Sequence, residues 1–146
     1  MHLSVPEEEA AYVLTNLETG MRLAGRVRLA GDSSARRKGL LGVHSLDRES
    51  GLWIIPCEAI HTFGMKMPID VVFLDRKYRV KKLLERLAPR RISVCLQASS
   101  VVEMRAGAIT ASRTKVGDRL DVRRLVDAGG TPTTEPVSLA STCPLS

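Results

Sequence analysis

The chain has 146 residues, of which 44% are apolar and 26% are charged, and this balance suits one globular domain with a real core. Its apolar runs, such as residues 71–74, are far too short to span a bilayer. The first residues lack the basic start and apolar stretch of a secretory signal, so we expect a cytoplasmic protein without membrane insertion. The three cysteines show no CxxC spacing, which argues against a disulfide framework or a structural zinc site.

The two ends of the chain differ from its middle in charge and composition. All 22 Lys and Arg lie in residues 11–126, whereas residues 1–10 and 127–146 contain Asp or Glu but no Lys or Arg. We predict a flexible arm at 1–10 and a disordered tail at 127–146. The Gly, Pro, Thr and Ser of the tail cannot bury enough apolar surface to offset the entropy lost on ordering. The middle, 11–126, is expected to be a single β-rich domain.

The first predicted elements are a hairpin and a short helix. Residues 12–17 and 22–30 flank the turn Glu18-Thr19-Gly20, a pattern typical of two strands joined tightly. In the second strand Val and Leu alternate with Arg, which predicts a sheet with one face in water. Asp32 or Ser33 can cap a helix over residues 34–41, because a side-chain oxygen there accepts a bond from an unpaired backbone N–H.

The remaining elements are mostly strands. Residues 52–55 are a short apolar strand that places Trp53 in the core, and residues 69–74, apolar on both faces, predict a central buried strand. Residues 78–87 fit a strand or a helix, and the tight Asp75-Arg76-Lys77 link before them favours a strand. Further strands are predicted at 92–96, at 101–104 and from Leu120, with one or two helical turns at 106–112 and a turn at Gly117-Asp118.

Four segments, in this order, resemble the family known as domain of unknown function 192. They are Arg36-Arg37-Lys38-Gly39-Leu40-Leu41, residues 60–75 (IHTFGMKMPIDVVFLD), Val101-Val102-Glu103-Met104-Arg105-Ala106-Gly107, and Val116-Gly117-Asp118-Arg119-Leu120. Many members read W-M-K-N-T-x-x-P-L-D where this chain runs from His61 to Asp70, so it resembles an H-T-F-G-M branch. The resemblance implies a compact α+β fold, mainly antiparallel β, with one or two short helices and with partial closure into a barrel as one form. It implies no established activity.

The stretch from Cys57 to Asp70 is expected to carry the functional site, because loops held by a rigid sheet are where functional residues gather. A carboxylate at Asp70, on a buried strand, needs partners. We favour a structural role in which its oxygens accept N–H or O–H bonds from residues 61–67. The alternative is an enzyme in which His61 and Asp70 form an acid–base pair, although no nucleophile motif such as G-x-S-x-G accompanies them.

Two other patterns have a simpler interpretation. Cys57, His61 and Met65 recur every four residues, and their side chains suit Cu(I), but this spacing aligns ligands only on a helix, which Gly64 and the nearby prolines disfavour. We therefore expect no metal and no cofactor, with Met65 as core filler. Glu103 and Arg105 alternate with apolar residues, which predicts that they lie on a solvent-facing side of their strand.

These patterns favour a non-enzymatic accessory domain that binds a small ligand or a peptide or protein partner in a groove near residues 60–70. The expected binding residues are Arg36, Arg37, His61, Thr62, Met65, Lys66 and Asp70. The alternatives are the enzyme using His61 and Asp70, and an Arg-rich nucleic-acid-binding protein. Positive charge attracts phosphates, yet the basic residues are spread along the chain and few aromatic residues are present to stack on bases.

Overall fold

The computed structural model describes residues 10–126 and 133–137, and for Arg36, Arg37 and Lys38 it describes the backbone alone. The predicted flexible arm therefore lies outside the described residues, apart from Ala10. So does most of the predicted tail. No helix in the described part of the chain is long and apolar enough to cross a membrane.

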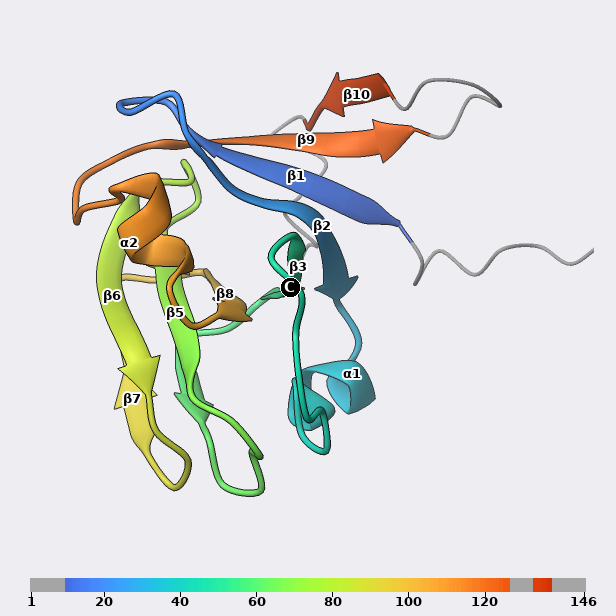
Figure 1. Ribbon diagram of the computed structural model, residues 1–146, viewed down its shortest axis with the longest axis vertical. Coiled ribbons are helices and arrows are strands. Elements are labelled where there is room, and N and C mark those ends of the chain that lie inside the picture. The colour runs from blue at the N-terminus through green and yellow to red at the C-terminus, as the bar shows by residue number, and fades with distance from the viewer. Residues whose placement is uncertain (1–9, 127–132, 138–146) are drawn as a thin grey trace, which may run out of the picture.

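Most of the domain is one eight-stranded sheet with the order β10-β9-β1-β2-β3-β8-β5-β6 (Figure 1). Its strands are β1 (Ala11–Asn16), β2 (Arg22–Ala30), β3 (Ser50–Ile54), β5 (Ile69–Leu74), β6 (Val80–Leu87), β8 (Ser100–Arg105), β9 (Leu120–Val126) and β10 (Thr133–Pro136). Neighbouring strands are antiparallel except β2 and β3, which are parallel. The predicted fold class, α+β and mainly antiparallel, is confirmed.

The other elements are a two-stranded ribbon and two short helices. The ribbon pairs β4 (Ala59–His61) with β7 (Ile92–Val94) in antiparallel register. Helix α1 (Ser33–Lys38) begins where the Asp32 side chain accepts the backbone N–H of Ala35 at 2.8 Å. Helix α2 (Ala108–Ser112) follows Gly107, whose φ of 103° is a conformation that a residue without Cβ adopts at low cost.

Each face of the sheet packs against its own group of apolar side chains. One face, which we call the α2 face, packs against Ile109 of α2 and includes Leu14, Trp53, Val72 and Met104. The opposite face, the ribbon face, packs against Ile60 of the ribbon and Leu40 after α1. Strand β5 is buried on both faces, as its apolar sequence predicts, because it lies between β8 and β6 with a core on either side.

The sheet is not closed into a barrel, which is a correction to the partial closure suggested by the family resemblance. One isolated antiparallel bridge, Arg79 with Arg119, joins the approach to β6 with the approach to β9. Beside it the backbone N–H of Val80 donates to the carbonyl of Asp118 at 2.8 Å. The pairing does not continue along β9, because β10 occupies the same edge of that strand at residues 123–126.

Several predicted elements differ in extent from those observed. The helix expected at 34–41 ends at Lys38, and the one expected at 106–112 begins at Ala108. The strand expected at 92–96 is shortened to β7, and residues 78–87 adopt the favoured strand structure as β6. Strand β4 lies inside a segment expected to be a loop. A strand of three residues is too short to be predicted from local strand propensity. Strand β4 forms because β7, about thirty residues later in the chain, pairs with it.

Residues 133–136, within the segment predicted to be disordered, form β10. This strand pairs with β9, and the backbone N–H of Val137 donates to the carbonyl of Val122 at 3.2 Å. Val137 packs against the core of the α2 face. An edge strand of this kind needs few buried side chains of its own, because backbone hydrogen bonds and one apolar contact hold it. The rest of the predicted tail lies outside the described residues.

Candidate ligand groove

A groove of about 1420 Å³ lies on the ribbon face of the domain. Its floor consists of apolar side chains of the ribbon-face core: Leu40, Ile54, Ile60, Met65 and Ala98. Its walls come from the residues after α1, from the segment entering β4, from residues 96–99 and from the hairpin between β5 and β6. The groove is thus assembled from segments that lie far apart in the sequence.

The ribbon forms one wall of the groove because its side chains alternate between the sheet and solvent. Ile60 and Ser93, which face each other across the ribbon, are both buried. His61 and its partner Ile92 are exposed. Two backbone bonds hold the entry to the ribbon, from Cys95 N–H to the Glu58 carbonyl at 2.7 Å and from Cys57 N–H to the Ser99 carbonyl at 2.9 Å. The ribbon therefore has a fixed position over the sheet.

Thr62, a predicted binding residue, instead joins two loops. Its side chain is 1% exposed. The hydroxyl donates to the carbonyl of Ala88 at 2.7 Å and accepts the backbone N–H of Arg91 at 2.8 Å. Its backbone carbonyl also accepts from Met65 and Arg90. These bonds tie the loop after β4 to the loop before β7, so Thr62 positions the groove wall and has no free group to offer a ligand.

Glu103 is the buried acidic group of the groove. It occupies the middle of β8, directly opposite Leu52 of β3 and Val71 of β5, and it is 4% exposed. Its Oε2 atom has no hydrogen-bond partner among the described residues. Burial raises the pKa of Glu103 from 4.5 to about 7, and a hydrogen bond from the backbone of Leu40 offsets part of that rise. Near neutral pH the protonated and ionised forms of this carboxyl group are therefore both populated.

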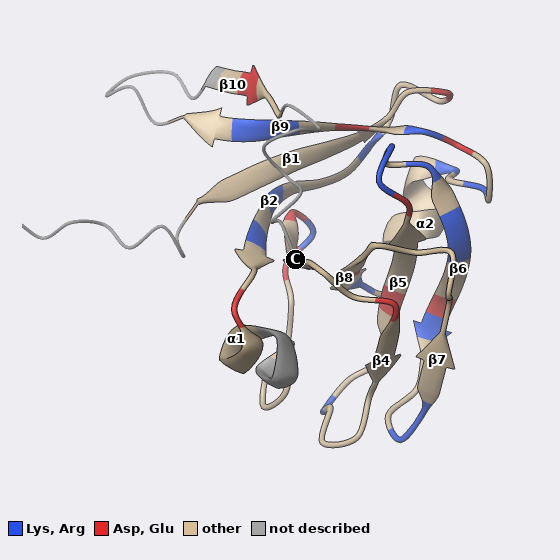
Figure 2. Cartoon of the chain, turned by 180° about the vertical axis from the view of Figure 1, so that it is seen from behind, with Lys and Arg blue, Asp and Glu red and all other residues tan. Residues whose placement is uncertain are grey.

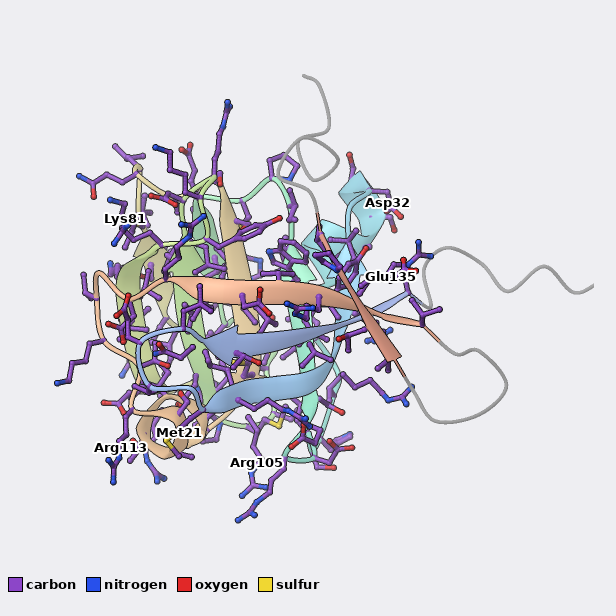
Figure 3. The ribbon with its side chains drawn as sticks, turned by 90° about the horizontal axis from the view of Figure 1, so that it is seen from above. Met21, Asp32, Lys81, Arg105, Arg113 and Glu135 are labelled. Carbon is purple, nitrogen blue, oxygen red and sulfur yellow. The ribbon has the colours of Figure 1, made fainter. Side chains whose placement is uncertain are left out.

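The buried position of Glu103 corrects the prediction of a solvent-facing strand side. A core packs on each face of β8, with Val102 and Met104 in one and Val101 in the other, so the side chains on both faces are covered. Arg105, at the end of the same strand, is exposed, and its side chain points away from the body of the molecule (Figure 3). The signal that could have found Glu103 was a single charge among Val101, Val102 and Met104.

Asp70 is fully buried, on the opposite, α2 face of the sheet. Its Oδ1 accepts the backbone N–H of Arg86 at 2.9 Å, and its Oδ2 accepts those of Gly107 at 3.1 Å and Ile109 at 2.9 Å. The carboxylate thus ties β6 and the start of α2 to β5. The expected bracing role agrees with these bonds, but the predicted donors, residues 61–67, are wrong because they lie on the ribbon face.

The predicted acid–base pair is not assembled. His61 is exposed on the ribbon and lines the groove, whereas the Asp70 carboxylate lies beneath α2, with the sheet between them. The nearest described ring to His61 is that of Phe63, with centroids 6.0 Å apart. The structure therefore gives no support to a mechanism that needs His61 and Asp70 in contact.

The other predicted binding residues are placed as follows. Met65 is 7% exposed and lies in the groove floor, in agreement with its expected role as core filler. Lys66 is exposed and does not line the groove. Arg36 and Arg37 belong to α1, but their side chains lie outside the described atoms. The structure thus brings His61 and Met65 together in the groove and separates Asp70 from them.

Part of the groove lining is basic. Lys and Arg side chains contribute to it at residues 76, 77, 79 and 81, in and after the hairpin turn that leads into β6. Asp75 lies 3.7 Å from the Lys81 ammonium group, and Arg79 donates to the Gly117 carbonyl at 2.8 Å. The groove lining therefore contains both the buried carboxyl group of Glu103 and a group of cationic side chains.

Metal ligands are not clustered in the described part of the chain. No three His, Cys, Asp or Glu residues lie close enough there to hold an ion. The segment from Cys57 to Met65 contains strand β4 and no helix, so the four-residue spacing of Cys57, His61 and Met65 does not align their side chains on one face.

Comparisons with known proteins extend the picture of the fold. The family model DUF192, described as "Uncharacterized ACR", matches residues 15–122. A search among curated proteins found no match. A crystal structure of a "putative transcription regulator" from Sinorhizobium meliloti 1021 is similar with a TM-score of 0.69 and 22% identity, over 77% of this chain and 92% of that one. A protein of unknown function from Novosphingobium aromaticivorans DSM 12444 has a TM-score of 0.67 and 20% identity, over 83% and 99%.

Proposed function

The chain belongs to the DUF192 family, and we propose that it is a non-enzymatic binding domain whose groove takes a ligand with an apolar body. The observation that carries this proposal is the apolar floor of an open groove of about 1420 Å³. Sites for drug-sized molecules usually measure roughly 300–1,000 Å³, so this groove also has room for an extended ligand such as a short peptide segment.

Exposed apolar side chains beside the groove support the same proposal. Leu96, in its wall, is 77% exposed, and Ile92 and Phe63 nearby are 69% and 49% exposed. Large apolar side chains gathered at one place on a protein surface commonly mark a binding site. A ligand that extends over the ribbon would cover these residues, whereas a ligand confined to the floor would leave them in water.

The two alternative functions have less support. An enzyme using His61 and Asp70 would need a contact that the fold does not make. Nucleic-acid binding usually depends on basic residues gathered on one face. In this chain they are spread over β2, β6, β9 and several loops (Figure 2). The described name of the S. meliloti protein points toward gene regulation, but a likeness at 22% identity supports a shared fold and no more.

The proposal can be tested with two apolar probes and the methyl signals of the protein. We expect 1-hexanol and N-acetyl-leucyl-leucine amide to shift the NMR signals of Ile60, Met65 and Ala98 in the groove floor. Stronger shifts with the dipeptide would favour a peptide ligand, and stronger shifts with hexanol a small molecule.

A matched pair of variants shows whether binding occurs in the groove. Leu96→Asp places a charge in the groove wall and should weaken binding at least about fivefold. Leu17→Asp places the same charge at an exposed position outside the groove and should leave binding unchanged. Equal loss in both variants, or shifts scattered over the surface, would show that the groove is not the binding site.

A further inference from the structure

We propose that Glu103 anchors the ligand of this groove and that the anchored group is a cation of the alkylammonium type. This inference rests on the proposed binding function and specifies its ligand chemistry. The ligand would place an apolar chain on the groove floor and direct an ammonium N–H group at the Oε2 atom of Glu103.

The first argument is that Glu103 has an unused acceptor in a place where unused acceptors are rare. Buried polar atoms in folded proteins almost always have a hydrogen-bond partner, and an unpaired one costs free energy. Glu103 is 4% exposed, yet its Oε2 has no partner among the described residues, and the side chain lines the groove. A ligand in the groove would reach a carboxyl group that the described part of the protein leaves unsatisfied.

The second argument is that Glu103 does not act as a structural brace. Its neighbours across β3 and β5 are Leu52 and Val71, which offer no donor from their side chains. Burial is the main influence on its pKa, and among the described residues only the backbone of Leu40 acts against it, with no contribution from a charged side chain. A carboxyl group used as a brace, such as Asp70, would instead be surrounded by donors.

The third argument concerns the charge of the partner. No described side chain supplies a counter-charge to Glu103, and a ligand ammonium group would supply both that charge and N–H donors. Hydrogen bonds between ionised groups are about twice as strong as those between neutral groups. A ligand alcohol could donate an O–H bond but would bring no charge, and a ligand carboxylate would be repelled. The geometry therefore ranks ammonium above alcohol and alcohol above carboxylate.

Three six-carbon probes with the same apolar chain test this ranking: n-hexylamine, 1-hexanol and hexanoate. Their affinities are measured by NMR titration of the groove-floor methyl groups at neutral pH. We expect hexylammonium to bind the wild-type protein about tenfold more tightly than hexanol, which corresponds to one charge-assisted hydrogen bond. Hexanoate should bind most weakly to the site at Glu103, although the cationic residues 76, 77, 79 and 81 of the same lining can attract it.

Glu103→Gln and Glu58→Gln form the matched pair of variants. Both remove one carboxyl group from the lining of the same groove, but Glu58 is exposed. Glu103→Gln should abolish the preference for hexylammonium while leaving hexanol binding intact. Glu58→Gln should preserve the preference within about twofold, because an exposed carboxylate contributes little. A measurement on wild-type protein alone adds a check: the ¹³C carboxyl signal of Glu103 should move when hexylamine is added.

The outcomes separate this inference from the proposed function. If hexanol and hexylammonium bind the groove equally, the cation anchor is wrong but the groove remains a binding site. If the preference survives in Glu103→Gln, or if the Glu103 carboxyl signal does not respond to hexylamine, the cation is held elsewhere and the inference fails. If none of the probes affects the groove-floor signals, both the inference and the proposed function are wrong.

Discussion

Asp70 and Glu103 are two buried carboxyl groups on adjacent strands, and they differ in almost every other respect. They sit one register position apart on β5 and β8, since Asp70 pairs with Met104 and Val71 pairs with Glu103. Asp70 faces α2 and accepts three backbone N–H groups. Glu103 faces the ribbon and leaves Oε2 without a partner among the described residues.

The difference shows how burial alone fails to identify the role of an acidic residue. At Asp70 backbone N–H groups donate to both carboxylate oxygens, so these hydrogen bonds stabilise the connection between β5, β6 and α2. At Glu103 the charge is disfavoured by its surroundings, as its raised pKa indicates. A carboxylate that is satisfied by the backbone serves the structure, whereas one that faces a groove with a free oxygen is available to a ligand.

The largest effect should come from removing the satisfied carboxylate. Asp70→Ala takes the acceptor away from as many as three N–H groups, each worth about 1–3 kcal/mol where water cannot reach it. We expect a loss of roughly 3–5 kcal/mol in the free energy of unfolding, measured by urea denaturation, and a smaller loss for Asp70→Asn, which keeps one acceptor oxygen. Asp121→Ala, at a partly exposed surface pair, is the control and should change stability by less than about 0.5 kcal/mol. If Asp70→Ala is as stable as the parent, the contrast with Glu103 has no basis.

Removal of the carboxyl group at Glu103 should raise the free energy of unfolding, whereas removal at Asp70 lowers it. Because the folded-state pKa of about 7 lies above the ordinary value of 4.5, the folded protein holds this proton more tightly. The resulting stability is fully present below pH 4.5 and is lost as pH rises through 7. Glu103→Gln should therefore be more stable than the wild type by about 2–3 kcal/mol at pH 8. Below pH 4.5 the difference should be small.

Urea unfolding of both proteins at pH 4 and pH 8 measures this difference, with Glu58→Gln as the control. A Glu103→Gln protein that is destabilised equally at both pH values would mean that the carboxyl group makes a structural bond, as Asp70 does.

A variant at Thr62 tests whether the ribbon depends on side-chain hydrogen bonds for its position, as the α2 face depends on those of Asp70. Thr62→Val keeps the shape of the side chain but removes the bonds to the Ala88 carbonyl and the Arg91 N–H. We expect a loss of about 1–2 kcal/mol in the free energy of unfolding and weaker probe binding in the groove. Thr110→Val, which loses one exposed bond to Glu85, should cost less. Unchanged groove binding in a destabilised Thr62→Val protein would show that the ribbon does not depend on this tie.

The smallest effect should be confined to the α2 face. Composition alone predicts that the residues after Val126 are dispensable, but Val137 packs against the core of that face. Ending the chain after Val126 should lower the free energy of unfolding by about 1 kcal/mol relative to a chain ending after Val137, because a partly buried Val and an edge strand are lost. Calorimetry measures this loss, and probe binding in the groove should not change. A loss of groove binding would mean that the two faces are coupled.

The parts of the fold that were predictable have strong local patterns. Strand β5 was evident because its residues are apolar on both faces, and the tight turn before Tyr78 correctly favoured a strand for β6. Strand β4 was missed because it depends on pairing with β7. The burial of Asp70 followed from its being a lone charge in an apolar strand, but its donors depend on which face α2 covers. Glu103 was predicted to face solvent because charged and apolar residues alternate in β8. Tertiary packing instead buries both faces of that strand.

The strand order has a consequence for the way the protein folds. Inside the sheet β3 is joined to β8, and the register pairs Gly51 with Met104, more than fifty residues away in sequence. Chains that depend on such distant pairings lose much entropy before their contacts form, so they fold more slowly than chains with local contacts. During synthesis, the edge of β3 that faces β8 stays unpaired until β8 emerges, and β4 stays unpaired until β7 emerges. Strand edges left unpaired at that stage are open to pairing with another chain.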